Sequence, residues 1–517
     1  MKITVYGLVL ILALSSSGIL LAQEKKEWNW GNYGDSTFIP ITVHLQSTSD
    51  IDAYQEAGIN VYSGFWYGLT EQILEDLRAK KMHYIAAWDK HKAWPSEEME
   101  ADLVARANMD DPLFIAWIQK DEPDNAQPDG QGGYGPCMDP QVIIDRYNEI
   151  KAIDTTGRQV LLNCGAGVAR TDAYIRGSCA GNTALYSEYY KGSDIASYDI
   201  YPVAAPPAPI ATNDALWYVG EGVRNMRLFT GDTMDAYWFN LECTDIKGEG
   251  KPSPGQIWIE AWMGIVAGGT SLAWFPFTVY PNTHNSRALL EDPEMMAAVK
   301  KVNAALHDLA VVINTETRNE LVDVELIKVN PWDIPVIEVD YMVKHLGDTL
   351  YIFTAGGQGT NPNTATFTLQ TSGDAVVSSN ATVLFEDREV EITNKQFVQE
   401  YTGQEIHLFK IGGITEDMFV GIHTPEIRST GGYGLEQNYP NPFPGRTSID
   451  FALPEAGLTT LRVFDLLGRE VETLVDEALA AGSYSVDFDA GSLKEGIYIY
   501  RIRSNDFSGL RKMMVIK

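Results

Sequence analysis

Three acidic residues surround a proline in the segment IQKDEPD, residues 118–124. They follow the apolar run LFIAW (113–117), whose composition is typical of a β-strand that is buried on both faces. Carboxylates are costly inside such a strand, so we expect Asp121 and Glu122 to lie where the strand leaves its sheet. At that place a pair of carboxyl groups could serve as proton donor and acceptor.

A second candidate acid follows another apolar run. In the segment WFNLECTD (238–245), Glu242 comes directly after aromatic and aliphatic residues that would fill the wall of a sheet. Whether Glu122 and Glu242 can work together depends on the architecture that carries the two runs.

The region from about residue 38 to 315 alternates between short apolar runs and helical patterns. Two helix starts are well marked, because Ser253, Pro254 and Gln256 form a capping-box pattern and Asp292 precedes Pro293. We expect eight strands, within residues 38–45, 60–68, 82–90, 113–122, 159–165, 194–203, 235–243 and 271–277. This order predicts a (β/α)₈ TIM barrel over residues 30–316. The alternative, an open doubly wound sheet, would more often show a glycine-rich turn after its first strand, and none occurs here.

In such a barrel the carboxyl ends of the strands form one mouth, which holds the active site. Asp121 and Glu122 fall at the end of strand four, and Glu242 falls at the end of strand seven. Two carboxyl groups that face each other across the mouth suit the cleavage of a glycosidic bond.

This pair resembles that of the clan A glycoside hydrolases, in which the fourth-strand Glu is the general acid/base and the seventh-strand Glu is the nucleophile. The resemblance covers Glu122 and Glu242 only, and Asp121 stands where most of that clan has Asn. It implies cleavage of a β-linked polysaccharide or oligosaccharide with retention of configuration. The chemistry requires Glu122 to be protonated and Glu242 to be ionised when substrate binds. Asp199 is the reserve candidate for the second carboxylate.

The other groups near the predicted mouth suit sugar recognition, because flat aromatic faces stack on sugar rings and polar groups bind hydroxyls. Asp199 and Tyr201 alternate with apolar Ile200, so they share one face of a strand end. The predicted substrate-binding set is Asp121, His44, Trp66, Trp88, Asn163, Asp199, Tyr201 and Trp274, with Tyr67, Lys90, Trp238 and Phe277 nearby. We expect no cofactor and no metal.

The first 22 residues read as a secretory signal peptide, with one lysine and an apolar run from Val5 to Leu14. No later stretch is long enough to cross a bilayer. The formal net charge of -31 over 517 residues disfavours nucleic acid and anionic membranes as partners. Export permits disulfides, and among the cysteines we expect a bridge within Cys137, Cys164 and Cys179 rather than one that uses Cys243.

After the barrel the pattern changes to strands separated by turn residues, which predicts an antiparallel β-sandwich over residues 317–412. Such a domain resembles the accessory β-domains that often follow glycosidase barrels. Residues 413–432 show no sustained period and are predicted to be a linker.

Residues 433–517 carry the most specific pattern. The segments NPFPG (441–445), LLGREV (466–471) and LKEGIYIYRI (493–502), and a basic, apolar end at Lys517, resemble the type A C-terminal sorting domain of the type IX secretion system. The resemblance implies an all-β domain, passage through both membranes to the surface or the medium, and the type IX secretion machinery as partner. It says nothing about catalysis, so residues 433–517 should be dispensable for chemistry.

Two functional classes fit the sequence. The first is a secreted glycoside hydrolase, and the second is a non-catalytic surface protein that binds glycan at the same mouth, because a barrel fold alone does not guarantee activity.

Overall fold

The structure is a computed structural model of the chain. It describes residues 35–65, 68–87, 101–127, 135–170, 183–204, 215–248, 250–280, 283–328, 337–359, 361–371, 378–419 and most of 434–516. The predicted signal peptide and most of the predicted linker lie outside these ranges.

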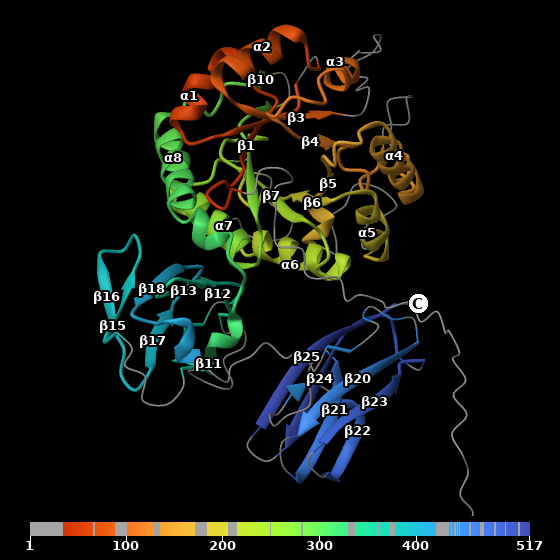
Figure 1. Cartoon of the computed structure of the whole chain (residues 1–517), viewed down its shortest axis with the longest axis vertical. Coiled ribbons are helices and arrows are strands. Elements are labelled where there is room, and N and C mark those ends of the chain that lie inside the picture. The colour runs from red at the N-terminus through yellow and green to blue at the C-terminus, as the bar shows by residue number, and fades with distance from the viewer. Residues whose placement is uncertain are drawn as a thin grey trace, which may run out of the picture.

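Eight parallel strands close into a barrel in chain order, which confirms the predicted (β/α)₈ architecture (Figure 1). Every strand pairs with its neighbours in sequence, and β8 pairs with β1 to close the ring. The strands are β1 (Ile41–His44), β2 (Val61–Ser63), β3 (His83–Ala87), β4 (Phe114–Ile118), β5 (Gln159–Cys164), β6 (Ile195–Asp199), β7 (Ala236–Glu242) and β8 (Ser271–Phe275).

Helices surround the barrel, and the predicted helix starts are confirmed. Ser253 and Gln256 form the capping box at the start of α7, and the Asp292 side chain accepts a hydrogen bond from the backbone of Met295 at the start of α8. The helices are α1 (Ile51–Glu56), α2 (Glu71–Lys80), α3 (Ala101–Ala107), α4 (Pro140–Ile153), α5 (Ala184–Tyr189), α6 (Tyr218–Thr230), α7 (Pro254–Val266), α8 (Pro293–Asp308) and the short α9 (Ala310–Ile313).

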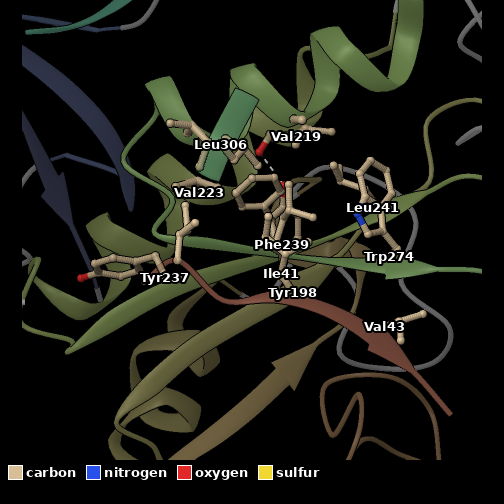
Figure 2. Close-up of a cluster of buried hydrophobic side chains, with 14 of the residues drawn as sticks. Ile41, Val43, Tyr198, Val219, Val223, Tyr237, Phe239, Leu241, Trp274 and Leu306 are labelled. Atoms are coloured by element: carbon tan, nitrogen blue, oxygen red, sulfur yellow. Dashed lines mark hydrogen bonds between the residues drawn. The ribbon is translucent and has the colours of Figure 1, made fainter. Parts of the chain in front are cut away.

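The side chains of each strand alternate between the barrel interior and the surrounding helices, as the strand period of two requires. In β7, Trp238 packs with interior residues of other strands, whereas Phe239 and Leu241 belong to the layer under the helices. Figure 2 shows that layer, in which the hydroxyl of Tyr198 donates to the carbonyl of Val219 on α6. These two apolar layers hold the strands rigidly and leave the polar residues to the carboxyl ends.

Two antiparallel sheets follow the barrel and enclose a core of their own, which agrees with the predicted sandwich. This accessory domain packs against α7, with the ring centroids of Trp262 and Phe353 5.6 Å apart. Ile414 and Phe419 are buried in its core, so the folded unit continues past residue 412. One sheet is β11 (Val322–Lys328), β14 (Asn363–Leu369) and β17 (Gln396–Tyr401), and the other is β12 (Val339–Leu346), β13 (Thr349–Gly356), β18 (Ile406–Gly412), β15 (Asn380–Val383) and β16 (Arg388–Glu391).

The C-terminal domain is also a pair of antiparallel sheets with a separate core (Figure 1, blue). Phe443, in the predicted NPFPG entry, is fully buried in that core. The three-stranded sheet holds β19 (Gly434–Leu435), β20 (Arg446–Leu453) and β23 (Gly482–Asp489), and the four-stranded sheet holds β22 (Glu470–Leu479), β21 (Gly457–Asp465), β24 (Gly496–Ser504) and β25 (Phe507–Val515).

The cysteines divide as the sequence suggested. Cys137 is disulfide-bonded, whereas Cys164 and Cys243 are buried free thiols. The prediction that Cys243 is not bridged is confirmed. Cys179, the remaining cysteine of the chain, lies outside the described residues. No helix within the described ranges combines the length and the apolar character that a membrane span requires.

Candidate active site

The end of β4 turns sharply at Glu122, which has a φ of 42° and so lies in the left-handed region. Several hydrogen bonds hold this turn. The backbone N–H of Glu122 donates to the carbonyl of Asn163 (2.9 Å), and its own carbonyl accepts from the N–H of Asn125 (3.2 Å) and the side chain of Gln127 (3.0 Å). Glu122 is therefore held, partly exposed, in a turn four residues after β4 ends at Ile118, whereas the predicted strand extends to residue 122.

Asn163 of β5 brings two acids together beside this turn. Its side-chain nitrogen donates to Asp121 (3.0 Å) and to Asp199 at the end of β6 (3.3 Å). Burial raises the pKa of Asp199 well above its usual value, and the negative charges of Glu122 and Asp121 raise it further. Asp199 is partly exposed as a residue, and its carboxyl group interacts electrostatically with that of Glu122.

A chain of hydrogen bonds fixes the orientation of Asn163. Its side-chain oxygen accepts from Ser197 and from the side-chain nitrogen of Asn240, both at 2.8 Å, which leaves its nitrogen for the two acids. The oxygen of Asn240 then accepts from Nε2 of His44 (2.6 Å). Burial lowers the pKa of His44, so its ring is neutral and carries its hydrogen on Nε2. His44 is thus a buried member of this network.

Aromatic rings form the flank of the mouth next to Asp199. Tyr201 interacts with Asp199, and burial together with that charge raises the pKa of the Tyr201 hydroxyl. The Tyr201 ring lies 5.2 Å from that of Phe275 at the end of β8, and the Phe275 ring lies 4.6 Å from that of Phe277. Tyr201 and Phe275 are partly exposed and can offer flat faces to a sugar ring.

Glu242 ends β7, as predicted, and it is fully buried. Its two carboxyl oxygens accept hydrogen bonds from the backbone N–H groups of Val203 and Ala204 in the segment that follows β6. The carboxyl of Glu260 on α7, also fully buried, interacts with it. Burial raises the pKa of Glu242 to about 7, although the two N–H groups oppose the shift. Burial, together with the charge of Glu242, also raises the pKa of Glu260 well above its usual value. The Glu242 carboxyl therefore contacts the backbone of Val203 and Ala204 and the side chain of Glu260.

Three of the predicted aromatic residues are buried and offer no face to a ligand. Trp274 is fully buried between the barrel and α8 (Figure 2). Its Nε1–H donates to Asn303 of α8 (3.0 Å). The prediction that Trp274 binds substrate is therefore wrong, because its position in β8 faces the helices. Trp238 fills the barrel interior, and Phe277 is buried. Trp66, Tyr67, Trp88 and Lys90 lie outside the described residues.

Several residues of the site were not predicted. Asn240 lies two residues before Glu242 on the same strand, so the period of two could have identified it. Asp124 and Gly165 follow β4 and β5, and their contact with each other has no signal in the sequence. Within the described ranges, no group of three His, Cys, Asp or Glu residues is arranged to hold a metal ion.

Comparison with known proteins identifies one part of the chain. Residues 437–517 match the family described as a secretion system C-terminal sorting domain, which confirms the sorting domain expected at the end of the chain. A sorting domain of this kind marks a protein for export to the cell surface or the extracellular space. No curated protein matches the chain by sequence.

Several solved structures match large parts of the chain at low identity and with TM-scores below 0.5. α-Galactosidase I from Mortierella vinacea is 10% identical with a TM-score of 0.44, over 74% of this chain and all of the other. An α-amylase from Anoxybacillus is 8% identical with a TM-score of 0.42, over 74% and 99% of the two chains. An endo-β-1,4-mannanase from Thermotoga petrophila is 9% identical with a TM-score of 0.36, over 92% and 97%.

Proposed function

We propose that this chain is a secreted glycoside hydrolase that cleaves β-linked glycans at the mouth of its barrel. One observation supports the proposal above the others. The strained turn after β4 holds Glu122, partly exposed, close enough to a second carboxyl group, Asp199, to affect its pKa, which burial and then the charge of Glu122 raise. A partly exposed acid close to a second acid with a perturbed pKa is typical of sites that transfer protons.

In the proposed reaction Glu122 is the general acid/base. It donates its proton to the leaving glycosidic oxygen while an ionised carboxylate attacks the anomeric carbon, so the glycosyl unit becomes bonded to the enzyme. Glu122 then takes a proton from water, and the water oxygen replaces the enzyme carboxylate at the anomeric carbon. The configuration at that carbon is retained after the two displacements.

Two residues compete for the role of the attacking carboxylate. The sequence position favours Glu242, at the end of β7. The partial exposure of Asp199 and its interaction with Glu122 support Asp199, whereas its raised pKa opposes the ionised form that attack requires. Glu242 is buried, but its two backbone N–H partners favour its ionised form. Both assignments keep Glu122 as the proton donor.

Three single variants test the proposal. Glu122→Ala should lower turnover of natural glycans by about 10² to 10⁴-fold, the usual contribution of general acid/base catalysis, and should spare the first step with activated aryl glycosides. Added azide should partly restore turnover of the activated substrate, because it attacks the glycosyl intermediate without needing a base. Removal of the attacking carboxylate should stop both substrate types, so Glu242→Ala and Asp199→Ala identify which residue it is.

The competing function is glycan binding without catalysis, and the aromatic flank formed by Tyr201 and Phe275 favours binding as much as catalysis. A purified protein that binds glycans and releases no reducing sugar, with or without Glu122, would establish that alternative. In either case the sorting domain supports the type IX secretion machinery as partner and passage through both membranes.

A further inference from the structure

Asp124, two residues after Glu122, is a buried carboxyl group that the proposed reaction does not use. Its side chain is held from two sides. One oxygen accepts from the backbone N–H of Gly165 (2.9 Å), directly after β5, and the other accepts from the hydroxyl of Tyr186 on α5 (3.0 Å). Asp124 is only 2% exposed, so it contacts no substrate and acts through its neighbours.

Gly165 is also the residue against which the Glu122 carboxyl rests. A β-carbon placed on Gly165 would lie 3.0 Å from Oε1 of Glu122 and 2.7 Å from the side-chain nitrogen of Asn125. Only a residue without a side chain leaves room for both groups at that spot. Gly165 therefore both binds Asp124 and supports the Glu122 carboxyl.

The turn needs such support because its backbone is strained. A glutamate with a φ of 42° is held in the left-handed region, which is unfavourable for a residue that carries a β-carbon. The backbone bonds of Glu122 to Asn163 and Asn125 hold the turn at one point. The hydrogen bond from Gly165 to Asp124 joins the later part of the turn to the same end of β5.

We propose that Asp124 is the positioning residue for the acid/base, because it fastens the turn of residues 121–127 to Gly165 and so keeps the Glu122 carboxyl over that glycine. This inference rests on the proposed function. Burial raises the pKa of Asp124 to about 7, and the charge of Glu122 adds to the shift. Several groups face Asp124, namely Glu122 in its own turn, Asp199 of β6, Cys164 of β5 and Tyr186, Tyr189 and Tyr190 beside α5.

Kinetics with two substrates test the proposal in the full chain. Asp124→Ala should lower kcat/KM for a natural glycan by about 10²-fold, because a misplacement of about 1 Å at a reacting group costs that much. It should lower kcat/KM for a dinitrophenyl glycoside by less than about 3-fold, because that leaving group needs no proton. Asp124→Asn keeps an acceptor for the Gly165 N–H, so its kcat/KM for the natural glycan should lie between that of Asp124→Ala and that of the wild type.

Asp154 provides the matched control at the opposite end of the barrel. Asp154 lies in the loop before β5 and is also 2% exposed. Its carboxyl accepts a hydrogen bond from Nε1–H of Trp117 (2.7 Å). Asp154→Asn should destabilise the fold and affect both substrates equally. An equal loss on both substrates for Asp124→Ala would assign it the same structural role and overturn the proposal.

Crystal structures of the wild type and of Asp124→Ala give a readout that does not need activity. We expect the Glu122 carboxyl to leave Gly165 in the variant, whereas an unchanged Glu122 would overturn the positioning role. If the Asp124→Ala protein does not fold, Tyr186→Phe, which removes one of the two contacts, takes its place in both measurements. A wild type that hydrolyses no glycan would refute the proposed function, and the crystal structures would still decide the role of Asp124.

Discussion

Replacement of Asp124 by asparagine should change how the stability of the barrel depends on pH. Burial, together with the charge of Glu122, raises the pKa of Asp124 from 3.8 to about 7, against the hydrogen bonds from Gly165 and Tyr186. Between these two values the folded protein binds a proton that the unfolded chain has released. The contribution of Asp124 to stability is therefore greatest below pH 4, falls as the pH rises to about 7, and is constant above it.

The size of the effect follows from the width of that window. Each pH unit contributes about 1.4 kcal/mol for one proton, and the window spans about three units, so the upper bound is about 4 kcal/mol. Other carboxyl groups titrate in the same range, and the measured quantity is therefore the difference between the wild type and Asp124→Asn. Relative to the variant, the wild type should lose up to that amount of unfolding free energy between pH 4 and pH 8.

Tryptophan fluorescence during denaturant unfolding measures this difference in the full chain. None of the twelve tryptophans lies within residues 433–517, so the signal omits the sorting domain. Asp154→Asn serves as a control of opposite sign. Burial alone would raise the pKa of Asp154, but its hydrogen bonds with Thr156 and Trp117 and the charge of Arg158 lower it. The wild type should therefore gain stability relative to Asp154→Asn as the pH rises to about 4, and the difference between the two proteins should stay constant above that pH. Parallel pH profiles for the wild type and Asp124→Asn would refute the reasoning.

Three further outcomes are expected. Cys164 and Cys243 should resist thiol reagents in the folded protein and react after unfolding, because both are fully buried. Rapid labelling of either thiol in the native state would contradict this. Mass mapping should find Cys137 bridged. A chain that ends at Phe419 should keep full hydrolytic activity, whereas one that ends at Ile411 should melt earlier, since it lacks the buried Ile414 and Phe419; equal melting of the two chains would oppose the domain limit. Glu260→Gln should raise stability at pH 8 more than at pH 5, because it removes one of two adjacent buried carboxyl groups whose pKa values are raised. Melting temperatures measured over a pH series test this, and an equal change at every pH would contradict it.

Much of the architecture could be predicted because local patterns and global packing agree. Strands that are buried on both faces leave continuous apolar runs, and the helices between them begin at marked caps such as Ser253 and Asp292. The sorting domain could be predicted because its motif residues are also structural, as buried Phe443 shows. The positions of Asp121, Glu122 and Asp199 at strand ends followed from the same reasoning, because a barrel collects its strand ends in one mouth.

The errors arose where side-chain direction or a distant segment decides the outcome. Trp274 stands near a strand end, but the odd and even positions of β8 cannot be assigned to faces without its partners, and this tryptophan faces α8. Glu242 stands at its predicted strand end, yet no local pattern shows that Val203 and Ala204 cover its oxygens or that Glu260 lies beside it. Each of these contacts joins segments far apart in the chain.

The end of β5 connects the acids of the site, although its sequence reads as an ordinary strand. The carbonyl of Asn163 binds the backbone of Glu122, its side chain binds Asp121 and Asp199, and Gly165 binds Asp124. Three carboxyl groups, and the backbone of the residue that carries a fourth, are therefore bound by two residues that carry no charge. Like charges brought this close repel each other, so they stay together only where neutral donors such as an amide side chain or a backbone N–H bind them. The placement of the proposed proton donor thus depends on β5 as much as on the turn that contains Glu122.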